Sequence, residues 1–219
     1  MTPKKYNRTF HLPFSFGRSN DDKVLDSCAH FLGKEVVLSS KLDGSNFAMT
    51  NDECFARSHN GPPKHSSFDW AKAFHGKIKA KISSNLAIYC EYMYALHSIS
   101  YTSLPHYVNV FNVLDMERNV WLSWDGVIAT AQCLNIPTVP LLYRGVINTE
   151  RDLTKLCEGL MADKEFVVDQ REGVVIRLAA EFADKDFAMS IAKNVRKNHV
   201  SPDNEHWNHQ KVIKNGLKI

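Results

Sequence analysis

Lys41, Asp43 and Gly44 belong to a short KLDG segment that follows the β-branched run of residues 34–39. A glycine at this place permits a tight turn or a close approach of the backbone to a ligand. A lysine held at such a turn can act as a nucleophile when burial or neighbouring cations keep its amine neutral. The alternative is an ordinary surface turn, because Asp-Gly is a common turn dipeptide.

Two isolated carboxylates stand in apolar segments that resemble strands. Glu91 interrupts the aromatic run of residues 86–93, and Glu172 begins the run EGVVIR. A buried carboxylate needs a partner, which for Glu91 is a ribose hydroxyl, a metal or an internal arginine. Glu172 suits a metal ligand that faces a cleft, and the alternative is a strand-start residue in water.

Basic side chains supply two candidate phosphate contacts. Arg57 follows a predicted hairpin and can bind a phosphate through its guanidinium fork. Lys193, Arg196 and Lys197 lie in the segment AKNVRKNHV, which can form a phosphate clamp. Taken alone, each group also fits a solvated surface.

The elements that must position these residues mix strands and helices without a regular βαβ alternation. Strands are predicted for residues 34–39, 86–93, 107–116 and 172–178, with a hairpin over residues 46–50 and 53–57. Helices are predicted for residues 21–31, 68–82, 125–134 and 149–161. This order favours an α+β architecture with mainly antiparallel sheets. No long linker interrupts the sequence, so we expect a single domain over residues 1–219, apparently without an additional C-terminal domain.

The composition is that of an ordinary globular protein, with an apolar fraction of 44% and a formal net charge of +3. This charge does not by itself indicate a nucleic acid, but it is compatible with a polyanionic partner. Five cysteines form no CxxC pair, which favours reduced thiols over a disulfide set or a zinc site. We expect no membrane segment and no signal peptide, and therefore a cytoplasmic protein.

Taken together and in this order, the segments resemble the covalent nucleotidyltransferase superfamily of RNA ligases, DNA ligases and mRNA capping enzymes. KLDGSN is similar to the motif that carries the nucleotide-accepting lysine. Asn46 resembles the RNA ligase branch, because DNA ligases usually have arginine at that place. The runs YMYALHSISYTSLPHYV and AKNVRKNHV resemble a group of small bacterial and phage RNA ligases.

The resemblance implies a nucleotidyltransferase domain with an ATP cleft between antiparallel sheets and their flanking helices. It implies an ATP-dependent RNA ligase that joins a 3′-hydroxyl to a 5′-phosphate RNA end through AMP bound to Lys41. Glu172 would hold Mg²⁺ or Mn²⁺, Glu91 would bind the ribose, Phe111 would stack on the purine and Lys193 would contact phosphate. The further nucleotide-binding candidates are Asp43, Gly44, Asn46, Arg57, Arg196 and Lys197.

Departures from the family pattern leave alternatives open. Ser39 and Ser40 stand where many relatives have an acid, and Val195 replaces a second lysine. A DNA ligase, a GTP-using capping enzyme and a non-catalytic RNA-end-binding module are the rival interpretations. Because we expect no additional C-terminal domain, we also expect weak RNA binding, helped by a protein partner. Candidate RNA contacts are a lysine-rich helix (Lys72, Lys77, Lys79, Lys81) and the His-rich tail with Trp207.

Overall fold

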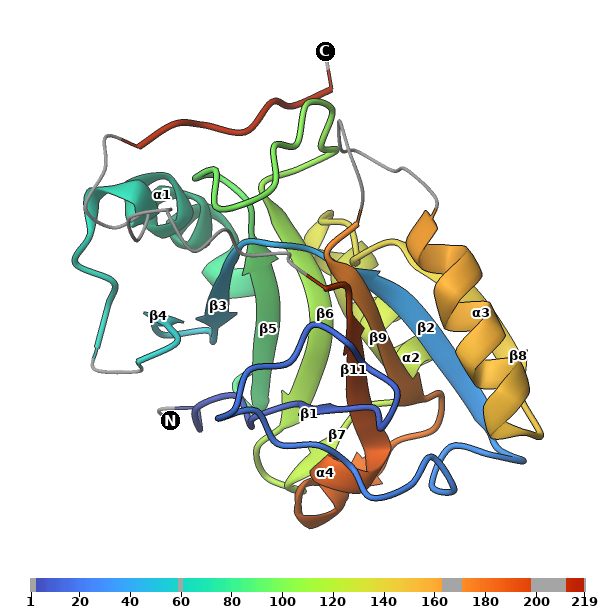
Figure 1. The fold of residues 1–219 in the computed structure, drawn as a ribbon. Helices are drawn as coiled ribbons and strands as arrows, with labels where there is room; N and C mark the ends of the chain where they lie inside the picture. The colour runs from blue at the N-terminus through green and yellow to red at the C-terminus, as the bar shows by residue number, and fades with distance from the viewer. Residues whose placement is uncertain (1–2, 59–60, 163–170, 198–211, 219) are drawn as a thin grey trace.

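Two β-sheets lie side by side in the computed structural model, which describes residues 3–58, 61–162, 171–197 and 212–218 (Figure 1). The first sheet has the strand order β1-β11-β9-β2-β8. Neighbouring strands in this sheet run antiparallel, except β1 and β11, which run parallel. The strands are β1 (Phe10–His11), β2 (Glu35–Lys41), β8 (Leu141–Val146), β9 (Gly173–Leu178) and β11 (Ile191–Val195).

The second sheet is antiparallel throughout and has the order β10-β7-β6-β5-β3-β4. Its central strands β5 and β6 are long and mostly buried. Together with the first sheet, it confirms the predicted mixture of helices and mainly antiparallel strands. The strands are β3 (Ser45–Met49), β4 (Cys54–Ala56), β5 (Leu86–Tyr92), β6 (Val108–Asp115), β7 (Val120–Trp121) and β10 (Phe182–Ala183).

The helices cover the outer faces of the two sheets. α3 (Glu150–Ala162) packs on the first sheet, and α1 (Asp69–Ile78) and α2 (Trp124–Leu134) pack on the second. Local sequence fixes where these helices start, since the Ser123 hydroxyl accepts the Gly126 backbone N–H and the Thr149 hydroxyl accepts that of Asp152. A short helix, α4 (Phe187–Ser190), precedes β11, and 3-10 turns at Ser66–Phe68, Lys79–Lys81 and Asp184–Asp186 extend α1 and α4.

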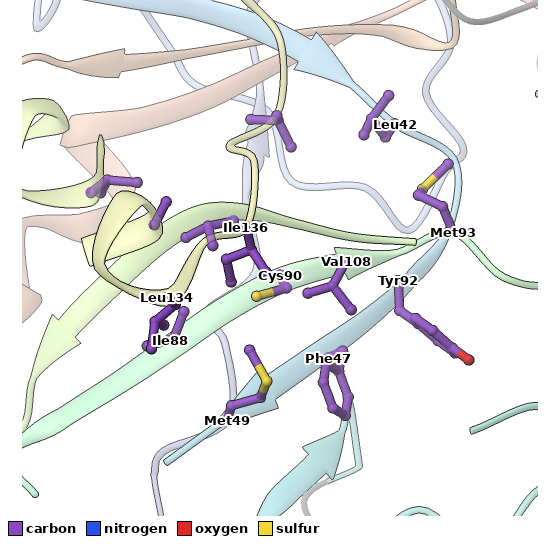
Figure 2. Close-up of a cluster of buried hydrophobic side chains, with 14 of the residues drawn as sticks. Leu42, Phe47, Met49, Ile88, Cys90, Tyr92, Met93, Val108, Leu134 and Ile136 are labelled. Carbon is purple, nitrogen blue, oxygen red and sulfur yellow. The ribbon is translucent and has the colours of Figure 1, made fainter. Parts of the chain in front are cut away.

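Alternation along the strands divides each sheet into an outer and an inner face. In β2, Val36 and Leu38 point to the cluster under α3, while Lys41 lies on the opposite face. In the second sheet, one face of β3 and β5 joins the end of α2 in an apolar cluster (Figure 2). Such burial contributes about 25 cal/mol per Å² of apolar surface. The inner faces carry polar side chains such as Lys41 beside a further apolar cluster that includes Tyr89, Phe111 and Val175.

The predicted helix over residues 21–31 is wrong. The backbone of Lys23 and Leu25 instead pairs with His11, and Leu25, Cys28 and Phe31 enter the core through turns. The acids that suggested a helix start are used otherwise, because the Asp22 carboxylate accepts the backbone N–H and hydroxyl of Ser19. Tertiary pairing has therefore overridden local propensity.

The other predicted helices and strands are confirmed within a few residues at their ends. The long strand β8 was not predicted, because its partly exposed side chains lack a clear alternation. All five cysteines are free, as expected from their spacing. In the described part of the chain, no helix is both long and apolar enough to span a bilayer.

Candidate functional site

Lys41 ends strand β2 at the wall of a cleft of about 1440 Å³ that is lined by both sheets. Its Nζ atom lies 2.7 Å from both carboxylate oxygens of Glu172. Glu172 directly precedes β9, where Gly173 is the Cα partner of Lys41. Glu172 is only 5% exposed, so the alternative of a strand-start residue in water is wrong.

The turn after Lys41 is held by the segment around residue 100. One carboxylate oxygen of Asp43 accepts three hydrogen bonds, from the backbone N–H of Ser98 and Ile99 and from the Ser98 hydroxyl. The Asp43 backbone N–H donates to the Tyr101 hydroxyl at 2.8 Å. Residues of the HSISY run (97–101) therefore hold the KLDG turn in place through Asp43.

Gly44 is required because the turn passes directly over strand β5. A Cβ atom at Gly44 would lie 2.6 Å from the carbonyl oxygen of Tyr92, which is closer than any side chain permits. The Gly44 backbone N–H donates to a carboxylate oxygen of Glu91 at 3.1 Å. The close approach therefore joins the KLDG turn to the acid on the second sheet.

Asn46 and Glu91 form the second-sheet wall of the cleft, where they are directly paired across β3 and β5. The side-chain oxygen of Asn46 is buried and has no hydrogen-bond partner among the described residues. Such an atom costs stability unless a ligand supplies a donor. Burial raises the pKa of Glu91 to about 8, against the opposing charge of Lys41, so its carboxyl can donate a hydrogen bond near neutral pH.

Lys193 reaches the same cleft from β11, on the other side of β9 from Lys41. Its Nζ lies 3.6 Å from Asp22, which also lies 3.3 Å from the Nε2 atom of His11. Burial and the nearby Lys41 lower the pKa of Lys193, whereas Asp22 opposes that effect. His11 and Asp22 were missed in the sequence, because only the fold brings their segment beside β11.

Phe111 and Arg57 also line the cleft. The Phe111 ring is partly buried and meets Tyr6 edge to face, with ring centroids 5.0 Å apart. Arg57 follows β4 and is exposed. Arg196 and Lys197 follow the end of β11 and are not among the described cleft-lining residues. Trp207 and the His-rich tail lie outside the described residues.

The ion pair with Glu172 decides the charge of Lys41. Burial alone would lower the pKa of Lys41, but the charge and the hydrogen bond of Glu172 outweigh burial and raise it. Lys41 is therefore an ammonium in the free protein, and it becomes a nucleophile only if this carboxylate is neutralised or engaged elsewhere. Among the described residues, no group of three or more His, Cys, Asp or Glu side chains forms a ready metal cage.

A pH-dependent stability follows from Glu91. Because its folded pKa of about 8 exceeds the ordinary value of 4.5, the folded state holds the proton more tightly than the unfolded state. The free energy of unfolding should fall as pH rises between these values, with a limiting slope of about 1.4 kcal/mol per pH unit. Urea unfolding of wild type, Glu91→Gln and the exposed control Glu53→Gln measures this. A Glu91→Gln variant with the wild-type slope would contradict it.

A family-level comparison decides the identity of the chain. The protein family described as RNA ligase matches residues 34–195, which include Lys41, Glu91, Glu172 and Lys193. The chain belongs to the RNA ligase family. A search of curated proteins finds no match.

Solved structures support the same RNA ligase fold at low sequence identity. An RNA ligase variant from Naegleria gruberi with ATP and Mn has a TM-score of 0.56 at 17% identity, over 90% of this chain and 57% of that one. An apo variant has a TM-score of 0.53 at 16% identity, over 77% of this chain and 51% of that one. The same ligase with pyrophosphate gives 0.54 at 18% identity, over 88% and 60%. The chain thus spans only half to about three fifths of these ligases.

Proposed function

We propose that this protein is an ATP-dependent RNA ligase that carries AMP on Lys41. In the first step, the Lys41 amine forms a bond to the α-phosphorus of ATP, and pyrophosphate leaves. The AMP then passes to the 5′-phosphate of an RNA, and an RNA 3′-hydroxyl displaces AMP to form the phosphodiester. The observation that carries the proposal is that Lys41, which is paired with Glu172, lines a cleft that Lys193 and Phe111 also line.

The cleft residues fit the needs of this chemistry. Lys193 and Arg57 would offset charge on the phosphates, where the loss of one such contact often costs about 10²–10³ in rate. A protonated Glu91 and the unpartnered Asn46 oxygen would bind hydroxyl groups of the nucleotide. We therefore assign the inner faces of the two sheets as the ATP cleft of a nucleotidyltransferase domain.

A divalent cation fits the site through Glu172, whose buried carboxylate lies 2.7 Å from the Lys41 ammonium. Mg²⁺ commonly uses one or two carboxylates and completes its shell with substrate phosphates and water, so a full protein cage is not needed. The bound ion would supply charge stabilisation at the α-phosphate and would draw Glu172 away from the Lys41 ammonium. The similar Naegleria gruberi ligase structures contain ATP and Mn, which supports a divalent cation as a cofactor of this chain.

The function is tested by the mass of the intact protein before and after incubation with ATP and Mg²⁺. One added AMP is expected, and an excess of unlabelled GTP should not compete with it. A guanylate adduct would favour a capping-type enzyme, and preferential sealing of DNA nicks by the labelled protein would favour a DNA ligase. No adduct with either nucleotide would favour a non-catalytic RNA-end-binding module.

Phe111 is expected to stack on adenine. Phe111→Leu keeps an apolar side chain in β6 but removes the aromatic face, so nucleotide affinity should fall more than stability. Val113→Ala, two residues along the same strand and fully buried, is the matched core control and should lower the melting temperature. Titration with ATP and thermal unfolding measure both variants. A large melting loss with unaltered ATP affinity for Phe111→Leu would reject stacking.

We further propose that residues 1–219 act as a single catalytic domain in the cytoplasm, with the five free cysteines reduced. RNA ends are its substrate, and a partner protein adds RNA-binding surface. Lys77, Lys79 and Lys81 are exposed on and after α1 and can contact RNA phosphates, whereas Lys72 is paired with Asp69 at 2.8 Å. Binding through such contacts should weaken steeply with salt.

A further inference from the structure

The segment of residues 212–218 lies along the loop of residues 94–107 that faces the KLDG turn (Figure 1, red segment beside the green loop). We call this segment the C-terminal strap. Five backbone hydrogen bonds join the two. The N–H of Leu96 donates to the Ile213 carbonyl and that of Leu104 to the Gly216 carbonyl, while the strap donates in return from Asn215 to Tyr94, from Gly216 to Tyr101 and from Lys218 to Leu104. The strap is therefore a built part of the structure beside the cleft.

Asn215 is the centre of the strap and is only 3% exposed. Its side-chain NH₂ donates to the carbonyl oxygens of Met93 and Ala95, at 2.8 and 3.2 Å. Its side-chain oxygen accepts the Tyr101 backbone N–H at 3.1 Å. One amide thus ties the two ends of the segment of residues 93–101 together.

That tied segment carries every contact to the Asp43 side chain and backbone described above. The Tyr101 hydroxyl accepts the Asp43 N–H, while Ser98 and Ile99 donate to the Asp43 carboxylate. Asp43 is two residues after Lys41, so the chain of contacts runs from Asn215 through Tyr101 to the turn that aims the nucleophile. No part of this chain depends on a ligand.

We propose that Asn215 is a positioning residue for Lys41, an inference that rests on the proposed function. The strap fixes the loop, the loop fixes Asp43, and Asp43 sets the direction in which Lys41 leaves β2. Neither Asn215 nor the strap lines the cleft among the described residues, so the strap has no direct role in binding ATP. Loss of the amide should lower the rate of AMP transfer more than the affinity for ATP, because misplacement of a reacting group by about 1 Å can cost roughly 10²-fold.

The experiment measures self-adenylylation of the full chain with ATP and Mg²⁺ in single-turnover reactions. Asn215→Ala should reduce the maximal rate constant by about 10- to 100-fold, while the ATP concentration at half-maximal rate stays close to that of wild type. Ile213→Ala is the matched control. It lies in the same strap, the residue is 60% exposed, and the substitution leaves in place its carbonyl oxygen, which accepts the Leu96 N–H.

A double-mutant cycle separates positioning from general stability. Tyr101→Phe removes only the hydroxyl that accepts the Asp43 N–H, and it should lower the same rate constant with little change in melting temperature. If Asn215 acts through Tyr101, the double variant should be scarcely slower than the slower single variant. Multiplied effects would show that Asn215 acts through the fold as a whole, and would overturn the proposal.

The possible outcomes are distinct. If wild type forms no AMP adduct, the proposed function fails and the inference fails with it. If wild type is labelled and Asn215→Ala is labelled equally fast, only the inference fails. Should Asn215→Ala not fold, Tyr101→Phe decides, because a wild-type rate for that conservative variant would overturn the proposed route to Lys41.

Discussion

Replacement of Lys41 by arginine is expected to abolish AMP transfer and to leave the protein folded. Arginine keeps a cation beside the Glu172 carboxylate, so the buried acid is not left without a partner. A guanidinium is always protonated in proteins and cannot attack the α-phosphorus. The variant therefore separates the nucleophilic role of Lys41 from its structural role.

Intact mass after incubation with ATP and Mg²⁺, followed by peptide mapping, measures the effect. Lys34→Arg is the matched control, because it is the same substitution at an exposed residue just before the same strand. The control should be labelled like wild type. An AMP adduct on Lys41→Arg at the wild-type level would show that another residue is the nucleophile.

Glu172→Gln is expected to have the second large effect on AMP transfer. It should lower the maximal rate and, at the same time, make Lys41 easier to deprotonate. Without the carboxylate, a divalent cation loses its protein ligand, so the maximal rate of AMP transfer should fall by about 10²–10³. The same change removes the strongest influence that raises the pKa of Lys41, while burial continues to lower it. The remaining activity should therefore reach its plateau at lower pH than in wild type.

The pH dependence of single-turnover labelling resolves both effects. Asp152→Asn, an exposed change on α3 far from the cleft, provides the control for loss of one negative charge. Thermal unfolding checks the fold, since Glu172 is buried and the variant leaves the Lys41 ammonium without its counter-ion. An unchanged maximal rate would refute the metal role, and an unshifted pH profile would refute the control of Lys41 by this carboxylate.

Much of the site could be predicted because the ordered segments KLDGSN, EGVVIR and AKNVRKNHV resemble the motifs of a known superfamily. The alternation of β2, β9 and β11 places Lys41, Val175 and Lys193 on one face, but only β2 and β9 were predicted as strands. That Glu91 and Glu172 serve one site was expected only from this resemblance, since the segment around each acid left other roles open. The burial of Glu172 was not predictable, since it depends on an ion pair with a residue 131 positions away.

The N-terminal part shows where local patterns fail. Asp22 and the apolar residues after it have helical spacing, but their backbone pairs with His11 and their acid faces Lys193. Nothing in a window of ten residues carries that information, because both partners come from distant segments. The strap was missed for the same reason, as Asn215 is recognised only by its contacts to Met93, Ala95 and Tyr101.

β2 and β11 run parallel to each other on either side of β9, and this pairing fixes the distance between Lys41 and Lys193. Lys41 is the Cα partner of Gly173 and Lys193 that of Val175, so their separation is fixed by two strand spacings and two residues of rise, roughly 12 Å between Cα atoms. Side-chain rotamers can move the two amines but do not change this distance between the Cα atoms. A one-residue slip of β11 against β9 would turn Lys193 out of the cleft and bring its neighbour in. The spacing of the two lysines is thus encoded in backbone pairing, so a change that shifts strand register would alter it even with both lysines in place.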